Sequence, residues 1–101
     1  MTADVHRSEY LRLHELTHRN LLRLIDSELG LALTMTELAE TESQLGDEAH
    51  AQVLLEKVAQ AVDSVRHHLS DDRISEEEER EVEDRLQGLK ERLELTRQRI
   101  A

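Results

Sequence analysis

The second half of the chain carries apolar residues at alternating steps of four and three, the spacing of one narrow stripe along an α-helix. Two such runs occur, and mostly Glu, Arg, Gln and Asp separate their members. The first run is Ala51, Leu55, Val58, Val62, Val65 and Leu69, and the second is Val82, Leu86, Leu89, Leu93, Thr96 and Ile100. The spacing predicts two amphipathic helices, over residues 47–69 and 75–100, with these stripes in a common core.

Two short breaks delimit the expected helices. Gly46 can adopt the left-handed conformation that ends a helix, and Asp47 can accept hydrogen bonds from the first N–H groups of the next one. The second break covers residues 70–75, where Ser75 and Glu78 have the spacing of a capping box. Four consecutive glutamates follow Ser75, in the first turn where the helix dipole favours negative charge. We interpret this run as a helix start rather than an acidic binding tail.

These features predict an all-α protein. The chain has no proline and only 3 glycines among its 101 residues, and it lacks the alternating β-branched or aromatic runs of a strand. Short connections favour antiparallel neighbours. We expect one domain, residues 1–101, folded as an antiparallel three-helix bundle with coiled-coil-like packing and helices over about residues 5–45, 47–69 and 75–100.

The first expected helix is longer than the bundle that it joins. At 1.5 Å per residue it would span about 60 Å, against about 35 Å for the second helix. Four of its leucines recur every seven residues, and we expect them to form a broad core stripe with their apolar neighbours. The leucines are Leu24, Leu31, Leu38 and Leu45, and the neighbours beside them are Leu21, Ile25, Ala32, Met35 and Ala39.

Two arrangements of this helix are open. It can break near residues 26–30, where Asp26, Ser27 and Gly30 favour a turn, so that the N-terminal segment folds back as a fourth helix. Alternatively it stays continuous, straight or kinked, and its end overhangs the bundle. We favour continuity, because a tight antiparallel link usually needs at least two dedicated residues.

A continuous first helix leaves apolar side chains without a partner in their own bundle. Exposed groups of this size usually mark an interface, so we expect contact with a second copy of the chain or another helical protein. The candidate interface residues are Tyr10, Leu11, Leu13, Leu16, Leu22 and Leu29. Tyr10 is the sole aromatic residue and therefore the best single anchor. This reasoning predicts a non-enzymatic interaction or oligomerisation module, most simply a homodimer.

The alternative function is a metal site in the same segment. The string His14-Glu15-Leu16-Thr17-His18 matches H-E-x-x-H, in which two histidines one turn apart bind zinc and the glutamate acts as general base. His14, Glu15 and His18 would serve a metal-binding bundle or a metal-dependent hydrolase. A zinc protease also needs a third ligand and a substrate-holding strand, which the sequence does not supply. We therefore expect no catalytic residues and no cofactor.

Charge and hydropathy argue against further classes of partner. The 23 acidic and 13 basic residues give a net charge of -10, which phosphates repel, so we expect no nucleic acid. We expect no membrane partner either, because no run of about 20 apolar residues occurs. The absence of cysteine excludes disulfides. The first residues lack the pattern of a signal peptide, which favours a cytoplasmic location.

Small and apolar residues around the first break form a recognisable pattern. They are Leu38-Ala39, Gly46-Asp47, Ala51 and Leu55. This pattern resembles the helical hairpin of a tetratricopeptide repeat or of the similar three-helix MIT domain, over about a third of the chain. Glu42 and Asp63 depart from it, because an aromatic residue and a proline are usual there, and no second repeat follows. The resemblance implies a hairpin used for protein contacts.

Overall fold

The first helix, α1, is unbroken from Thr2 to Gln44 and is far longer than its neighbours. It has 43 residues, against 22 in α2 (Glu48–Leu69) and 25 in α3 (Glu76–Ile100). The computed structural model describes the backbone of residues 2–100 and the side chains of residues 7–100. Within this range every regular element is a helix, which confirms the prediction of an all-α three-helix bundle. The continuous first helix is likewise confirmed, and the alternative break near residues 26–30 is wrong.

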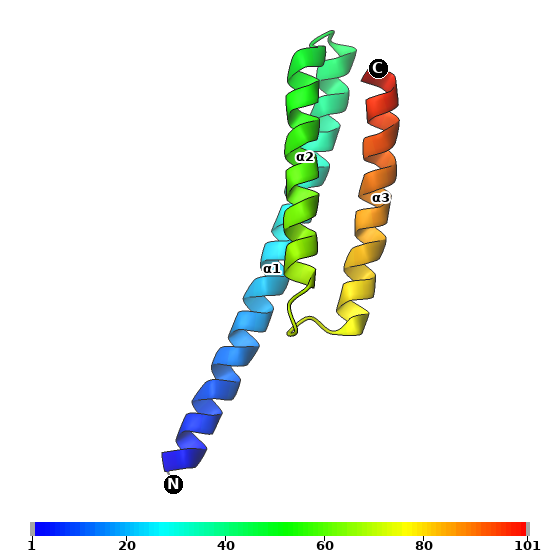
Figure 1. Ribbon diagram of the computed structural model, residues 1–101. Helices are drawn as coiled ribbons and strands as arrows, with labels where there is room; N and C mark the ends of the chain where they lie inside the picture. Colours follow the sequence, from blue (N-terminus) through cyan, green and yellow to red (C-terminus); the bar gives the residue numbers. More distant parts are fainter. Residues whose placement is uncertain (1, 101) are drawn as a thin grey trace.

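The three helices form an elongated bundle with one protruding end. Figure 1 shows α2 returning along the C-terminal part of α1 and α3 reversing direction again, so consecutive helices are antiparallel. The N-terminal part of α1 continues past the turn that joins α2 to α3 (Figure 1). The molecule measures 68 × 21 × 15 Å, and its long dimension is set by α1, whose 43 residues span about 65 Å.

The turn between α1 and α2 has the geometry that its sequence predicts. Gly46 has a φ of 88°, a conformation that costs glycine nothing because it has no Cβ. The N–H of Asp47 donates to the carbonyl of Glu42 at 2.8 Å, and the side chain of Asp47 accepts from the N–H of His50 at 3.1 Å. These bonds satisfy both helix ends and set the antiparallel return of α2.

The turn before α3 contains the predicted capping box. The hydroxyl of Ser75 accepts from the N–H of Glu78 at 3.2 Å, and Oε1 of Glu78 accepts from the N–H of Ser75 at 3.0 Å. Upstream, the guanidinium of Arg73 donates to both carboxylate oxygens of Asp71, and these bonds hold the pKa of Asp71 far below its ordinary value. Ile74 is buried beside them and attaches the turn to the core.

The core confirms both predicted stripes and corrects the third. Every member of the runs in α2 and α3 is buried. In α1, however, the buried positions are Ile25, Leu29, Ala32, Thr36 and Ala39. The predicted stripe is therefore right for Ile25, Ala32 and Ala39, with Leu21 and Met35 packed against them. It is wrong for Leu24, Leu31, Leu38 and Leu45, whose side chains are 42–76 % exposed.

The packing of α1 on α2 explains which stripe is buried. α1 packs more extensively on α2 than on α3. The small side chains of Ala39 in α1 and Ala51 in α2 are completely buried, and small residues at a contact let two helix axes approach closely. Thr36 fits the same interface because its hydroxyl donates to the carbonyl of Ala32 at 2.8 Å. The heptad of leucines would hold the axes further apart.

Among residues 2–100, none of the three helices combines the length and the apolar character that crossing a bilayer requires.

Candidate interaction surface

The protruding end of α1 begins where its contacts with the rest of the bundle stop. Nε2 of His18 lies 2.9 Å from Oε1 of Glu78, the glutamate of the capping box at the start of α3. From residue 7 to residue 17 every side chain is exposed. We call residues 7–17 the overhang; at 1.5 Å per residue it extends about 16 Å. His18 therefore joins the root of the overhang to α3.

The overhang carries four of the six predicted interface residues. Tyr10 is 67 % exposed, Leu11 50 %, Leu13 63 % and Leu16 49 %. The ring of Tyr10 stacks near that of His14, with centroids 6.3 Å apart and an interplanar angle of 21°. Large apolar side chains that are 49–67 % exposed are thus concentrated on one short helical segment.

The other two predicted interface residues belong to the bundle. Leu29 is buried in the core, and Leu22 is partly buried against it. The prediction of an exposed interface position is wrong for both, because they lie on the same buried face of α1 as Ile25, one helical turn before it and one turn after it. Their position on that side could have been inferred from the core stripe, had the stripe been placed correctly.

The H-E-x-x-H residues do not converge on a metal position. Oε1 of Glu78 engages His18, while His14 lies close enough to Asp71 to contribute to lowering the pKa of that carboxyl. Within residues 7–100, the one group of three potential ligands with donor atoms mutually within 4.8 Å lies elsewhere. The helical spacing of the string is as predicted, but Glu78 engages His18 and, among the described residues, no third ligand joins the two histidines.

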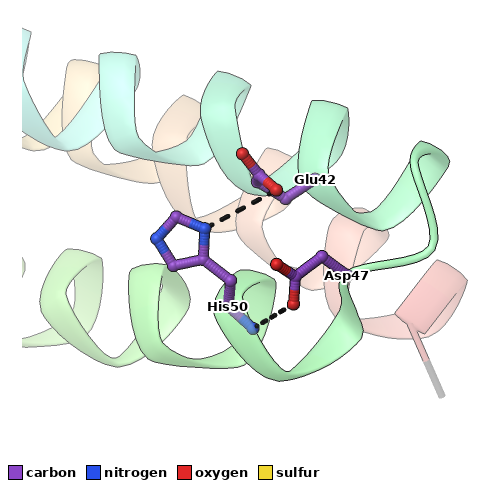
Figure 2. A group of neighbouring side chains, drawn as sticks. All are labelled: Glu42, Asp47 and His50. Atoms are coloured by element: carbon purple, nitrogen blue, oxygen red, sulfur yellow. Dashed lines mark hydrogen bonds and ion pairs between the residues drawn. The ribbon is translucent and has the colours of Figure 1, made fainter.

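That other group is made by Glu42, Asp47 and His50 at the turn between α1 and α2 (Figure 2). Nδ1 of His50 lies 3.6 Å from Oε2 of Glu42, and the backbone N–H of His50 donates to Asp47. A cation here would compete with the helix cap for the Asp47 carboxylate. The sequence predicted the cap but not His50, which the tight turn brings back beside Glu42.

An arginine holds α3 to α1 through two glutamates. Nε and Nη2 of Arg92 donate to the two oxygens of Glu40 at 3.0 and 3.1 Å, and Nη1 lies 3.4 Å from Glu37. The hydroxyl of Thr96 donates to Oε1 of Glu40 at 3.1 Å. The Arg92 bonds are the main reason that the pKa of Glu40 is lowered, against some desolvation. Arg85 and Asp26 form a further ion pair between the same helices.

A polar contact of a different kind joins α1 to α2. The hydroxyl of Ser64 donates to Oε1 of Glu28 at 2.9 Å, and Nε2 of His68 lies 3.7 Å from the same oxygen. The second oxygen, Oε2, is buried and has no hydrogen-bond donor among the described side chains. This contact lies at the helix interface rather than in an open site, and the residues involved are 36 and 40 positions apart in sequence.

Comparison of the chain with protein-family models, with curated proteins and with solved structures finds no match. The resemblance of residues 38–55 to a tetratricopeptide or MIT hairpin therefore stays a prediction.

Proposed function

We propose that this protein is a non-enzymatic helical interaction module that forms a homodimer through the overhang of α1. The observation that carries the proposal is the exposure of Tyr10, Leu11, Leu13 and Leu16 on a helix that continues beyond its own bundle. The core begins at Leu21, so the overhang adds nothing to it. An apolar segment without an intramolecular role is typical of an interaction surface.

The energetics favour a dimer. Burying each large apolar side chain contributes roughly 1.5–3 kcal/mol. A symmetric dimer buries every contact residue twice, because a two-fold axis places the same patch on both subunits. Because these side chains are already partly buried in the single chain, the eight of them contribute about half that amount each, which is comparable with an association cost of about 4–15 kcal/mol. Another helical protein is the alternative partner, and the mass of the isolated chain distinguishes the two.

The bonds of His18 and of two glutamates of α1 support a non-enzymatic role. Glu78 is bonded to His18, and Arg92 donates hydrogen bonds to Glu40 and Glu37. These polar contacts hold α3 against α1. The net charge of -10 further disfavours a nucleic-acid partner, and the cytoplasmic location expected from the sequence stays a prediction.

The test is the double substitution Leu13→Glu with Leu16→Glu. We expect the wild-type chain to sediment as a dimer at high micromolar concentration and the variant to sediment as a monomer with most of its helical circular dichroism. Charged side chains at these exposed positions oppose burial between subunits but leave the core, which starts at Leu21, intact.

The matched control is Val53→Glu with Leu95→Glu. Both residues are exposed apolar side chains, on α2 and α3, so the control adds the same charge elsewhere. It should remain dimeric. A wild-type chain that stays monomeric at several hundred micromolar would refute the proposal of self-association.

A further inference from the structure

A second regular stripe follows α1 on the side opposite its core residues. Its positions alternate in steps of three and four, and we call it the outer seam. It consists of Tyr10, Leu13, Thr17, Asn20, Leu24, Ser27, Leu31, Thr34, Leu38, Thr41 and Leu45, the last in the turn just after the helix. All eleven side chains are exposed, and none is charged. In a chain with 36 % charged residues, a solvated helix face would be expected to carry several charges.

The leucines make the outer seam continuous with the overhang. Leu24 is 44 % exposed, Leu31 57 % and Leu38 42 %, so each retains a large apolar surface in the single chain. Tyr10 and Leu13 belong to the same stripe. The exposed apolar surface of the overhang therefore continues along α1 from Tyr10 to Leu38.

The threonine hydroxyls of the outer seam already have hydrogen-bond acceptors within α1. The hydroxyls of Thr17, Thr34 and Thr41 donate to the carbonyls of Leu13, Gly30 and Glu37, four residues earlier in each case, at 2.7–3.1 Å. A buried polar group costs free energy only when it lacks a partner, and these hydroxyls already have one. Asn20 and Ser27 are the remaining polar members, and one or two such residues in an apolar seam select register.

The period of the stripe indicates the geometry of its partner. A repeat of seven residues averages 3.5 per turn, which wraps two helices around each other in a left-handed supercoil. The matching surface must present the same spacing over about five heptads, and the outer seam of a second copy does so. Self-pairing also leaves α2 and α3 of each copy on the outside of the assembly.

The charges on α1 select the orientation. Its N-terminal half, residues 7–23, contains four arginines and two glutamates, whereas residues 24–44 contain five acidic side chains and neither lysine nor arginine. Arg85 and Arg92 of α3 offset part of this negative charge, but five carboxylates still outnumber two guanidiniums. A parallel pair would align the two acidic halves, and an antiparallel pair aligns each acidic half with a basic one.

We propose that two copies of this chain pair antiparallel along their outer seams, with the two-fold axis near Leu24 and Ser27. This inference rests on the proposed function, because it supplies the partner and the geometry for the same overhang. In this register Leu13 lies opposite Leu38 of a second copy, and Thr17 lies opposite Thr34. Each overhang then covers the outer face of the other copy's bundle.

Cysteine cross-linking tests the orientation cleanly, because the full-length chain has no cysteine of its own. Thr17→Cys and Thr34→Cys, one of them isotopically labelled, are mixed and oxidised at a concentration where the wild type is dimeric. We expect the mixed disulfide, and no disulfide from either variant alone. Two copies of residue 17 would lie about 25 Å apart along the seam, whereas a disulfide needs Cα atoms within about 7 Å. Ser27→Cys, next to the axis, should cross-link to itself.

A second pair of variants separates this proposal from the one on which it rests. Leu31→Glu with Leu38→Glu should raise the dimer dissociation constant at least tenfold and leave helicity unchanged, while Val53→Glu with Leu95→Glu should not. A chain that is monomeric throughout would refute the proposed function itself. A dimer in which Thr17→Cys links to itself, or which survives Leu31→Glu with Leu38→Glu, would leave the proposed function standing and overturn the antiparallel outer seam.

Discussion

At the scale of single residues, local sequence rules predicted the helix ends well. Ser75 and Glu78 are three positions apart, and Gly46 and Asp47 are neighbours, so the bonds that they make depend on little beyond their own turn. His18 and Glu78 are 60 positions apart, and their contact depends on where α3 begins relative to α1. No local pattern could predict such a pair.

The three glycines illustrate how the same residue type acts differently in a turn and in a helix. Gly88 lies in the middle of α3, is exposed, and a Cβ built there meets no atom within 4 Å. Gly88→Ala should therefore raise the free energy of unfolding by about 0.5–1 kcal/mol, because alanine restricts the unfolded chain and favours the helix.

Gly46→Ala is the contrasting variant, and it should lower the free energy of unfolding by about 1–2 kcal/mol. Space is again available, but the φ of 88° at Gly46 is unfavourable for a residue with a Cβ. Urea denaturation of both variants at one fixed protein concentration measures the difference. Equal effects of the same sign would show that helix propensity and turn conformation are not the deciding causes.

At the scale of the elements, the sequence predicted α2 and α3 more reliably than α1. Each of those helices has one apolar stripe, so only one face can be buried. α1 has two stripes, one rich in small residues and one of leucines spaced by seven, and spacing alone does not rank them. The close approach of α2 at Ala39 and Ala51 favours burial of the stripe rich in small residues. The sequence of α1 alone does not contain this tertiary constraint.

The ion pair between Glu40 and Arg92 predicts how the contact of α1 with α3 responds to acid. Hydrogen bonds from Arg92 lower the pKa of Glu40 in the folded chain. A lowered folded-state pKa stabilises the fold above the ordinary glutamate pKa of about 4.3, and this contribution disappears as the pH falls through the folded-state value. Glu40→Gln should cost about 1 kcal/mol or less at pH 7, because Arg92 is partly exposed.

The measurement is the difference in free energy of unfolding between wild type and Glu40→Gln from pH 7 down to pH 2. That difference should shrink below about pH 4. Glu94→Gln changes the charge of α3 equally at an exposed position and serves as the control. A difference for Glu40→Gln that does not vary with pH would mean that the ionised carboxylate contributes nothing to the contact.

At the scale of the whole molecule, the length of α1 links folding to association. The helix exceeds the bundle, so the chain has a core of its own and a separate apolar surface beyond it. The overhang was predictable because it follows from helix lengths. The outer seam was missed as a surface, because its leucines were assigned to the core.

Two leucine-to-alanine substitutions separate these two apolar surfaces. Leu55 is 1 % exposed and Leu31 57 %, although both belong to regular apolar stripes. Leu55→Ala should lower the free energy of unfolding by about 2–5 kcal/mol at every protein concentration, because it opens a cavity in the core of the single chain.

Leu31→Ala should behave differently, because its partner is another copy of the chain. Association stabilises the folded state by mass action, so the Tm of the wild type should rise with protein concentration. The Tm of Leu31→Ala should equal that of the wild type at low micromolar protein concentration. As the concentration increases, the Tm of the variant should rise less than that of the wild type. Thermal unfolding followed by circular dichroism over a hundredfold concentration range measures both effects. If Leu31→Ala instead lowered the Tm by the same amount at all concentrations, Leu31 would contribute to the core of the single chain. The outer seam would then not be a contact between copies.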